Sequence, residues 1–204
     1  NVDLVVLFPD GRISDVQRRM MTTTAASNVH ALALQGTFDD CQSIVKGLFN
    51  HHAFRDQVAL AGVNSINWAR IIAQVVYYFT SAVALGAPQR EVDFTVPTGN
   101  FGDIFAGYVA KRMGLPVRRL RIASNVNDIL SRTLSTGIHE VREVHATTSP
   151  SMDIQISSNF ERLLFEASGR DASLVRGLMA SLKQSGRYVL PDAVLAAIRS
   201  EFDA

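Results

Sequence analysis

The stretch of sequence that decides the fold is VDFTVPTGNFGDIFAG, residues 92–107. Apolar residues alternate over 92–96, as in a half-buried strand, and Pro97 has no N–H to donate to a sheet. Apolar residues recur at helical spacing from Ile104 onward, and Gly114 provides a stop. The sequence therefore predicts a strand, a turn with glycines, and a helix.

The turn has the composition of an anion site. Gly99 and Gly102 lack a Cβ, so the backbone between them can take positive φ or lie directly against a ligand, and Asn100 tolerates the left-handed region better than most residues. The positive end of the helix dipole favours a phosphate or carboxylate. The spacing matches neither a dinucleotide turn nor a P-loop, because Tyr108 stands where the P-loop has lysine. Such turns also serve as plain connectors, and that alternative stays open.

The composition excludes several classes of protein. With 20 basic and 19 acidic residues, a net charge of +1 gives no general attraction to nucleic acid or membranes. The single cysteine, Cys41, fits a reducing compartment and predicts a cytoplasmic protein. The apolar stretch 68–87 contains polar residues and indicates a buried helix. A cluster of three arginines indicates an exposed strand end rather than a phosphate or partner site: Arg118, Arg119 and Arg121.

Apolar runs and helical patterns alternate along the first two thirds of the chain. This alternation predicts an α/β fold: a three-layer parallel sheet with helices on both faces. Past Ser135 the pattern predicts a mostly helical continuation. The expected strands are 2–8, 30–34, 92–96 and 115–123; the expected helices are 14–21, 38–49, 64–86, 102–113, 129–134, 156–168, 172–184 and 192–202.

Several stretches together resemble the threonine synthase family. The turn PTGNFGD, residues 97–103, followed by Ala106-Gly107, is similar to the family's phosphate-binding loop. Four further stretches match in the family's order: 7–14, 36–42, 64–70 and 125–128. The resemblance implies a two-domain, fold-type-II pyridoxal phosphate enzyme. It places 1–61 in a smaller mobile domain, 62–135 in the large cofactor-binding domain, and 136–204 in a helical continuation of the large domain.

The resemblance also implies a reaction and a site. The family converts O-phospho-L-homoserine and water to L-threonine and phosphate. By family position, the cofactor phosphate would be held, mostly through backbone N–H groups, by Gly99, Asn100, Phe101, Gly102 and Asp103. Asp103 would act as a first-turn acid or orient the loop, because its charge disfavours direct contact with phosphate. Asn64, Ser65 and Asn67 would approach the substrate, and capping of the following helix is their alternative role.

A pyridoxal phosphate enzyme needs a lysine that holds the cofactor as a Schiff base. None of the three lysines, Lys46, Lys111 and Lys183, stands in the family's lysine motif. We expect that motif upstream of Asn1, so this stretch alone should be inactive and supplies no catalytic residue. The dispersed histidines and single cysteine predict no metal site. Two alternatives remain: a non-catalytic anion-binding or interaction module, and a related enzyme acting on another hydroxy- or thio-amino acid.

Overall fold

The structure, a computed structural model, describes residues 2–204, which divide into two compact units between Ala61 and Gly62. Both units contain parallel strands connected through helices, so the predicted α/β class is confirmed. Within the described residues no helix has the length and apolar character needed to cross a membrane.

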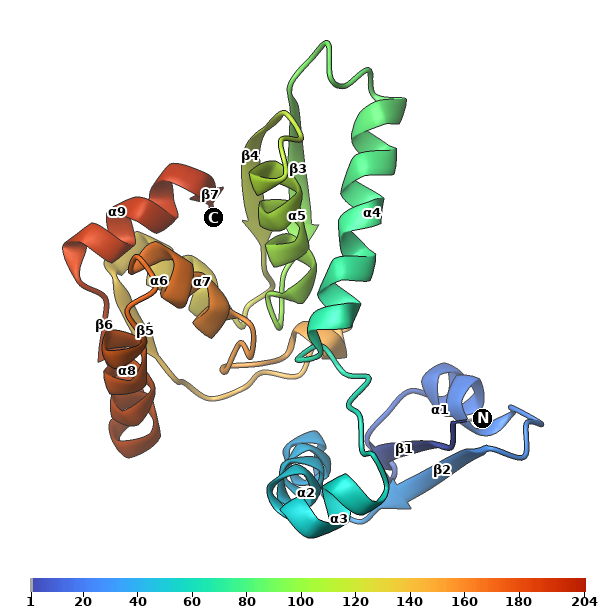
Figure 1. Ribbon diagram of the computed structural model, residues 1–204. Helices are drawn as coiled ribbons and strands as arrows, with labels where there is room; N and C mark the ends of the chain where they lie inside the picture. Colours follow the sequence, from blue (N-terminus) through green and yellow to red (C-terminus); the bar gives the residue numbers. More distant parts are fainter. Residues whose placement is uncertain (1) are drawn as a thin grey trace. The chain divides into compact units, whose positions relative to one another are not determined.

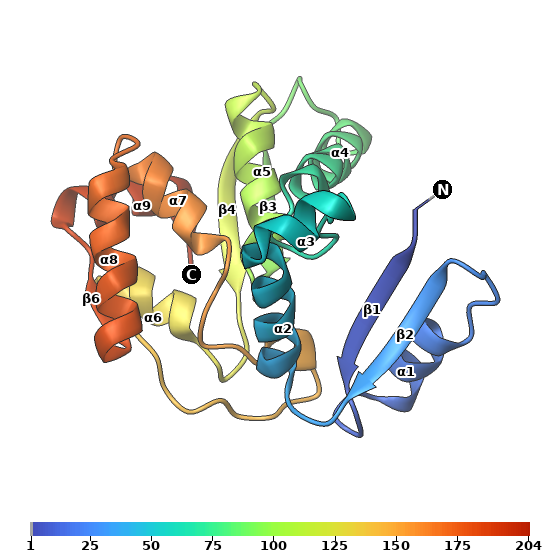
Figure 2. The ribbon, with the colours of Figure 1, turned by 60° about the horizontal axis from the view of Figure 1, so that its bottom comes forward.

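The first unit begins with a strand, a helix and a parallel strand. β1 (Leu4–Pro9) pairs with β2 (Val29–Leu34), and Figure 2 shows the two arrows side by side. α1 (Asp15–Thr22) lies between them in the chain. Ser14 caps this helix, which the sequence predicts over 14–21: its hydroxyl accepts from the Gln17 N–H, and the Gln17 side chain accepts from the Ser14 N–H in return.

Two helices complete the first unit: α2 (Phe38–Asn50) and α3 (His52–Gln57). Thr37 and Asp40 form a second capping box at the start of α2. Hydrogen bonds from the Thr37 side chain and backbone lower the pKa of the Asp40 carboxyl. Cys41 is buried, and burial raises the pKa of its thiol, as expected for an unreactive side chain.

The first strand is less buried than its apolar sequence predicts. Phe8 is buried, but Val5 is 55% exposed and Leu32, on β2, is 53% exposed. The continuous apolar run at residues 2–8 predicts a fully buried strand, and this is wrong for Val5. A sheet of two strands cannot enclose its own apolar side chains.

The sheet of the second unit has three parallel strands in the order β3-β4-β7. β3 (Val92–Pro97) and β4 (Val117–Ala123) match the prediction closely. The third strand, β7 (Phe202–Asp203), was missed, because the sequence predicts helix through residue 202. α9 (Asp192–Glu201) ends one residue earlier, and the chain then pairs with β4.

Two helices pack together on the apolar face of this sheet. α4 (Trp68–Ala84) contacts α5 (Gly102–Arg112), which lies over β3 and β4 in Figure 1. Gly107 permits the close approach: a Cβ there would lie 2.5 Å from the ring of Tyr78. That ring also packs edge-on against Phe94 of β3, at 4.8 Å between centroids.

α4 is not buried on all sides, contrary to the expectation from its apolar sequence. Its buried face is formed by Ile71, Val75, Tyr78 and Ala82. The other side exposes apolar residues, with Val76 at 56% and Tyr77 at 61%. The helix therefore packs through one stripe, at the spacing expected of an amphipathic helix.

The remainder of the second unit combines helices with a small antiparallel sheet. The predicted helices appear as α6 (Ile129–Thr136), α7 (Phe160–Ala167) and α8 (Ala172–Ser185), and a short 3-10 helix spans Pro150–Met152. The sequence did not predict β5 (Ile138–Glu140) and β6 (Arg187–Val189), which pair with each other. Each has only three residues, too few to show a period.

The arginines of β4 are paired with carboxylates. Arg118 contacts Asp93 at 2.6 Å, Arg119 contacts Asp203 at 3.2 Å, and Arg121 lies 3.6 Å from Asp93. The hydrogen bonds from Arg118 lower the pKa of Asp93. These partly exposed pairs stabilise the fold weakly, and the three arginines share two carboxylates, Asp93 and Asp203.

Candidate anion-binding site

The turn after β3 is a short loop between sheet and helix. The Thr98 N–H donates to the Ala123 carbonyl at 2.8 Å, which extends the strand pairing by one residue. The Thr98 hydroxyl donates to the Val96 carbonyl at 2.6 Å. Residues 97–103, called the anion loop below, then lead directly into α5.

Phe101, not a glycine, has the left-handed backbone in the anion loop. Its φ is 63° and ψ is 1°, whereas Gly99, Asn100 and Gly102 have no positive φ. The left-handed residue therefore lies between the two glycines, as the sequence allows, but it is not Asn100. Such a conformation costs a bulky residue on the order of 1 kcal/mol. Burial compensates, because the Phe101 ring lies 5.3 Å from Phe160 and is 1% exposed.

The glycines are needed for close approach rather than for their φ angles. A Cβ on Gly99 would lie 2.7 Å from the Ser151 carbonyl oxygen, closer than real Cβ contacts. A Cβ on Gly102 would meet the Asn159 side-chain nitrogen at 3.4 Å. The segment around residues 151–159 therefore lies directly against the anion loop.

The carbonyl groups of the anion loop are anchored by this segment. The Ser157 hydroxyl donates to the Gly99 carbonyl at 2.8 Å. The Asn100 carbonyl accepts from both the backbone N–H and the Nδ2 of Asn159, each at 3.0 Å. In a trans peptide the N–H points opposite to the carbonyl. The N–H groups of Asn100 and Phe101 therefore point away from the segment that holds the loop.

The N–H groups of Gly99 through Ile104 donate to no other residue in the described chain, 2–204. The first helical bond of α5 is donated by Phe105, to the Phe101 carbonyl at 3.1 Å. Unpaired N–H groups at the positive end of an 11-residue helix favour an anion. The loop therefore fits a phosphate group bound by backbone.

Asp103, in the first turn of α5, is held by Tyr78 of α4. The Tyr78 hydroxyl lies 2.9 Å from the Asp103 carbonyl and 3.2 Å from its carboxylate. Burial, reinforced by the Asp103 charge, raises the pKa of Tyr78, so the phenol stays a donor at neutral pH. Asp103 thus joins the start of α5 to α4.

The three residues before α4 that were predicted to approach the substrate or to cap the helix have different roles in the structure. Asn67 is the N-cap: its Oδ1 accepts from the Ala69 N–H at 2.8 Å. Asn64 and Ser65 do not cap the helix. Asn64 closes a local turn, and the Ser65 carbonyl accepts from Asn159 Nδ2 at 2.8 Å. The structure therefore joins this stretch to the anion loop through Asn159.

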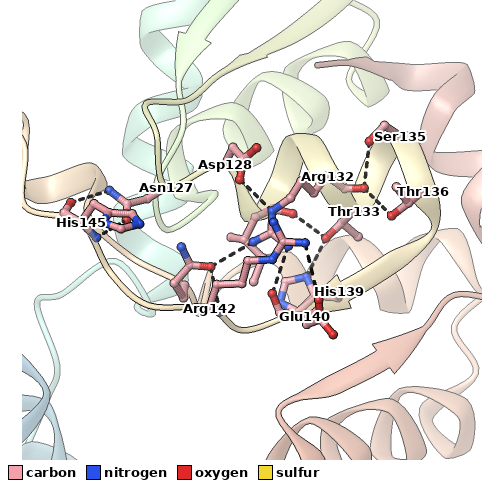
Figure 3. Close-up of polar contacts among 12 residues, drawn as sticks. Asn127, Asp128, Arg132, Thr133, Ser135, Thr136, His139, Glu140, Arg142 and His145 are labelled. Carbon is pink, nitrogen blue, oxygen red and sulfur yellow. Dashed lines mark hydrogen bonds and ion pairs between the residues drawn. The ribbon is translucent and has the colours of Figure 1, made fainter.

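Asn125–Asp128 forms a polar junction. Asn125 and Asn127 donate to the Asp153 carboxylate at 2.7 and 3.1 Å. Partial burial opposes ionisation of Asp153, but its hydrogen bonds outweigh this and lower its pKa. Asp128 begins α6 without a side-chain cap, because its carboxylate instead accepts from Arg132 Nε at 2.7 Å (Figure 3).

His139 is a buried histidine next to this junction. Its ring stacks on Tyr188 at 4.6 Å and lies 5.8 Å from Phe160. Its Nδ1 lies 2.9 Å from the Thr133 hydroxyl, as Figure 3 shows. Burial, with a smaller contribution from the charge of Arg132, lowers the pKa of His139 to about 4. The ring is therefore neutral at pH 7.

A cleft with a volume of about 590 Å³ lies beside the segment that holds the anion loop. Its walls include Ile66, Trp68, Phe105, Ser158, Arg162 and Phe165. The anion loop does not line this cleft, so we assign the loop on its N–H groups alone. Among residues 2–204, no group of three His, Cys, Asp or Glu side chains is placed to hold a metal ion.

Comparisons with known proteins find similar sequences and structures, although no protein-family model matches the chain. Threonine synthase of Pseudomonas aeruginosa is 52% identical over 204 residues, 100% of this chain and 44% of that protein. The crystal structure of PLP-bound threonine synthase from Brucella melitensis matches with a TM-score of 0.91 and 68% identity, again over 100% of this chain and 44% of that one. This chain is homologous to threonine synthases.

The yeast enzyme gives the same result. Its crystal structure matches this threonine synthase homologue with a TM-score of 0.85 and 44% identity, over 98% of this chain and 42% of the yeast chain. The homologue thus spans less than half the length of these relatives. The family resemblance inferred from five short stretches is confirmed along the chain.

Sequence reasoning missed the residues that support the anion loop. In this threonine synthase homologue, Ser157 and Asn159 are buried and bond to loop carbonyls. The sequence predicts a helix from residue 156, whereas α7 begins at Phe160. The polar triplet before Phe160 was the available signal, because Ser and Asn favour positions ahead of a helix.

Proposed function

We propose that the full-length protein carrying this chain is a threonine synthase. It converts O-phospho-L-homoserine and water to L-threonine and phosphate, with pyridoxal phosphate as cofactor. Homology to the Pseudomonas enzyme and likeness to the PLP-bound Brucella structure support this proposal. Both relatives are more than twice as long as this chain, which therefore supplies part of the site.

The observation that carries the proposal is the row of unpaired N–H groups at the start of α5. We infer that Gly99, Asn100, Phe101, Gly102 and Asp103 hold the cofactor phosphate through these groups. The helix dipole and the oriented peptides supply the positive potential, since residues 92–107 contain no cationic side chain. The bound cofactor withdraws electrons from the substrate during the reaction. The loop's task is to fix the cofactor's position.

The side chains proposed to approach the substrate are Asn64, Ser65 and Asn67. Asn67 already caps α4, so its role there is positional. The Ser65 hydroxyl makes no hydrogen bond with any residue in the described range 2–204, so it remains available to a ligand. We therefore assign direct substrate contact to Ser65 and Asn64 before Asn67.

We assign no catalytic residue within the chain. Lys111 pairs with Glu201 at 2.6 Å, while Lys46 and Lys183 lie in α2 and α8. The lysine that binds the cofactor is proposed to lie outside these residues. The proposal also includes a cytoplasmic location, which the single buried cysteine, Cys41, supports.

The two units suggest how the full protein is divided. We propose that residues up to Ala61 belong to a smaller mobile domain and that 62–135 belong to the large cofactor-binding domain. Residues 136–204 would continue the large domain. The pairing of β7 with β4 supports this last assignment, because it places residues 202–203 in the same sheet as β3.

The test uses the full-length protein and follows phosphate release from O-phospho-L-homoserine. We expect release that depends on pyridoxal phosphate, with L-threonine formed in equal amount. Binding of pyridoxal phosphate without phosphate release would instead identify a non-catalytic module. Turnover of another hydroxy- or thio-amino acid, without turnover of phosphohomoserine, would identify a related enzyme. Either of these results would overturn the proposal.

A further inference from the structure

Asn159 lies between the anion loop and the stretch before α4, and it bonds to both. Its Nδ2 donates to the Ser65 carbonyl at 2.8 Å and to the Asn100 carbonyl at 3.0 Å. Its backbone N–H also donates to the Asn100 carbonyl. The side chain is 0% exposed. Two segments that the proposed function assigns to cofactor and substrate are thus joined by one buried amide.

The orientation of this amide is set by its partners. Arg162 Nε donates to Asn159 Oδ1 at 3.0 Å, and a guanidinium can only donate. The two carbonyls on the other side can only accept, so they require the NH₂ group. A second nitrogen of Arg162 donates to the Ile66 carbonyl at 2.6 Å, and the guanidinium lies 5.5 Å from the Trp68 ring centre. The arginine that orients Asn159 is therefore itself held in place.

This arrangement matches the chemistry of an asparagine closely. Aspartate has a similar shape and keeps an acceptor for Arg162, but it would oppose the Ser65 and Asn100 carbonyls with oxygen instead of N–H. The Asn100 carbonyl would keep the Asn159 backbone N–H but would face a carboxylate oxygen in place of Nδ2, and rotation of its peptide would relieve that repulsion. Rotation of the peptide after Asn100 would turn the Phe101 N–H out of the row of anion-binding groups.

We propose that Asn159 is a positioning residue that holds the anion loop and residues 64–67 in a fixed relation. Through the Asn100 carbonyl it fixes the direction of a phosphate-binding N–H, and through the Ser65 carbonyl it fixes the segment assigned to the substrate. The inference rests on the proposed function. It adds that cofactor phosphate recognition and substrate binding both depend on this side chain.

The test compares Asn159→Asp with wild type in the full-length protein. Dissociation constants for pyridoxal phosphate and for pyridoxal, which lacks the phosphate, are measured by absorbance titration, together with KM for phosphohomoserine. We expect Asn159→Asp to reduce the preference for the phosphate-bearing form at least tenfold and to raise KM. The control is Thr133→Val, which removes a buried hydroxyl bonded to Ile129 and His139 instead of the loop. This control should lower the stability of the protein but leave the preference for pyridoxal phosphate and the KM for phosphohomoserine unchanged.

A second variant covers the case in which Asn159→Asp fails to fold. Ser157→Ala removes only the hydrogen bond to the Gly99 carbonyl, and it should reduce the phosphate preference about two- to fivefold. An unchanged preference in the folded variants would overturn the positioning role, as would an equal loss in the Thr133→Val control. If wild type itself showed no preference for pyridoxal phosphate, the phosphate assignment of the loop would fail first, and the role of Asn159 with it.

Discussion

Acidification should destabilise the second unit through His139. The pKa of about 4 in the folded state lies below the value of about 6.5 in an unfolded chain, so the unfolded state takes up the proton first. The stability contributed by the neutral ring is complete above pH 6.5 and is lost as the pH falls from 6.5 to 4. These values give a loss of about 2 kcal/mol between pH 7.5 and pH 5, and about 3 kcal/mol by pH 4.

Urea unfolding of wild type and of His139→Gln, at pH 7.5 and at pH 5, measures this effect. Fluorescence of Trp68, the single tryptophan of the chain, reports the second unit. The variant should be less stable at pH 7.5, because the stacking on Tyr188 is lost. The stability difference between the two proteins should shrink by about 2 kcal/mol at pH 5. The reasoning would be refuted if the stability difference between the two proteins were the same at pH 7.5 and pH 5. It would also be refuted if an NMR titration gave His139 a pKa near 6.5.

Two further predictions follow from glycine positions. Gly99→Ala brings a methyl group to 2.7 Å from the Ser151 carbonyl oxygen, so the anion loop must shift. In a cofactor titration, the affinity of the variant for pyridoxal phosphate should fall at least tenfold. An affinity equal to that of wild type would contradict the close packing at Gly99. Gly107→Ala meets the Tyr78 ring at 2.5 Å and should lower the unfolding free energy by about 1–3 kcal/mol. The control is Gly177→Ala at an exposed position of helix α8, where an added Cβ would meet no atom within 4 Å. It should raise the unfolding free energy by up to about 1 kcal/mol in the same denaturation assay.

The strand, turn and helix at residues 92–112 could be predicted because local patterns specify them. Alternation sets β3, Pro97 ends it, and the apolar spacing of α5 runs until a glycine. The start of α1 was equally local, because the sequence predicts a helix from residue 14 and Ser14 is its N-cap. In each case the deciding residues lie within a few positions of the element they determine.

The features that were missed depend on contacts between distant residues. The positive φ of Phe101 is compensated by packing against Phe160 and Phe202, and no local pattern reveals that compensation. β7 has two residues and depends on β4 for its pairing. Asn159 looked like part of a helix, because its partners Ser65 and Asn100 are far away in the sequence. Tertiary contacts decided each of these positions.

The pairing of Phe202 with β4 also bears on how the protein is made. The Phe202 ring packs 5.4 Å from Phe101 and 5.9 Å from Tyr108, so the aromatic support for the anion loop is supplied about a hundred residues later in synthesis. At roughly 5–20 residues per second, a ribosome needs about 5–20 seconds to cover that distance. During this interval the nascent chain carries the anion loop without the Phe202 ring that packs against it in the folded structure.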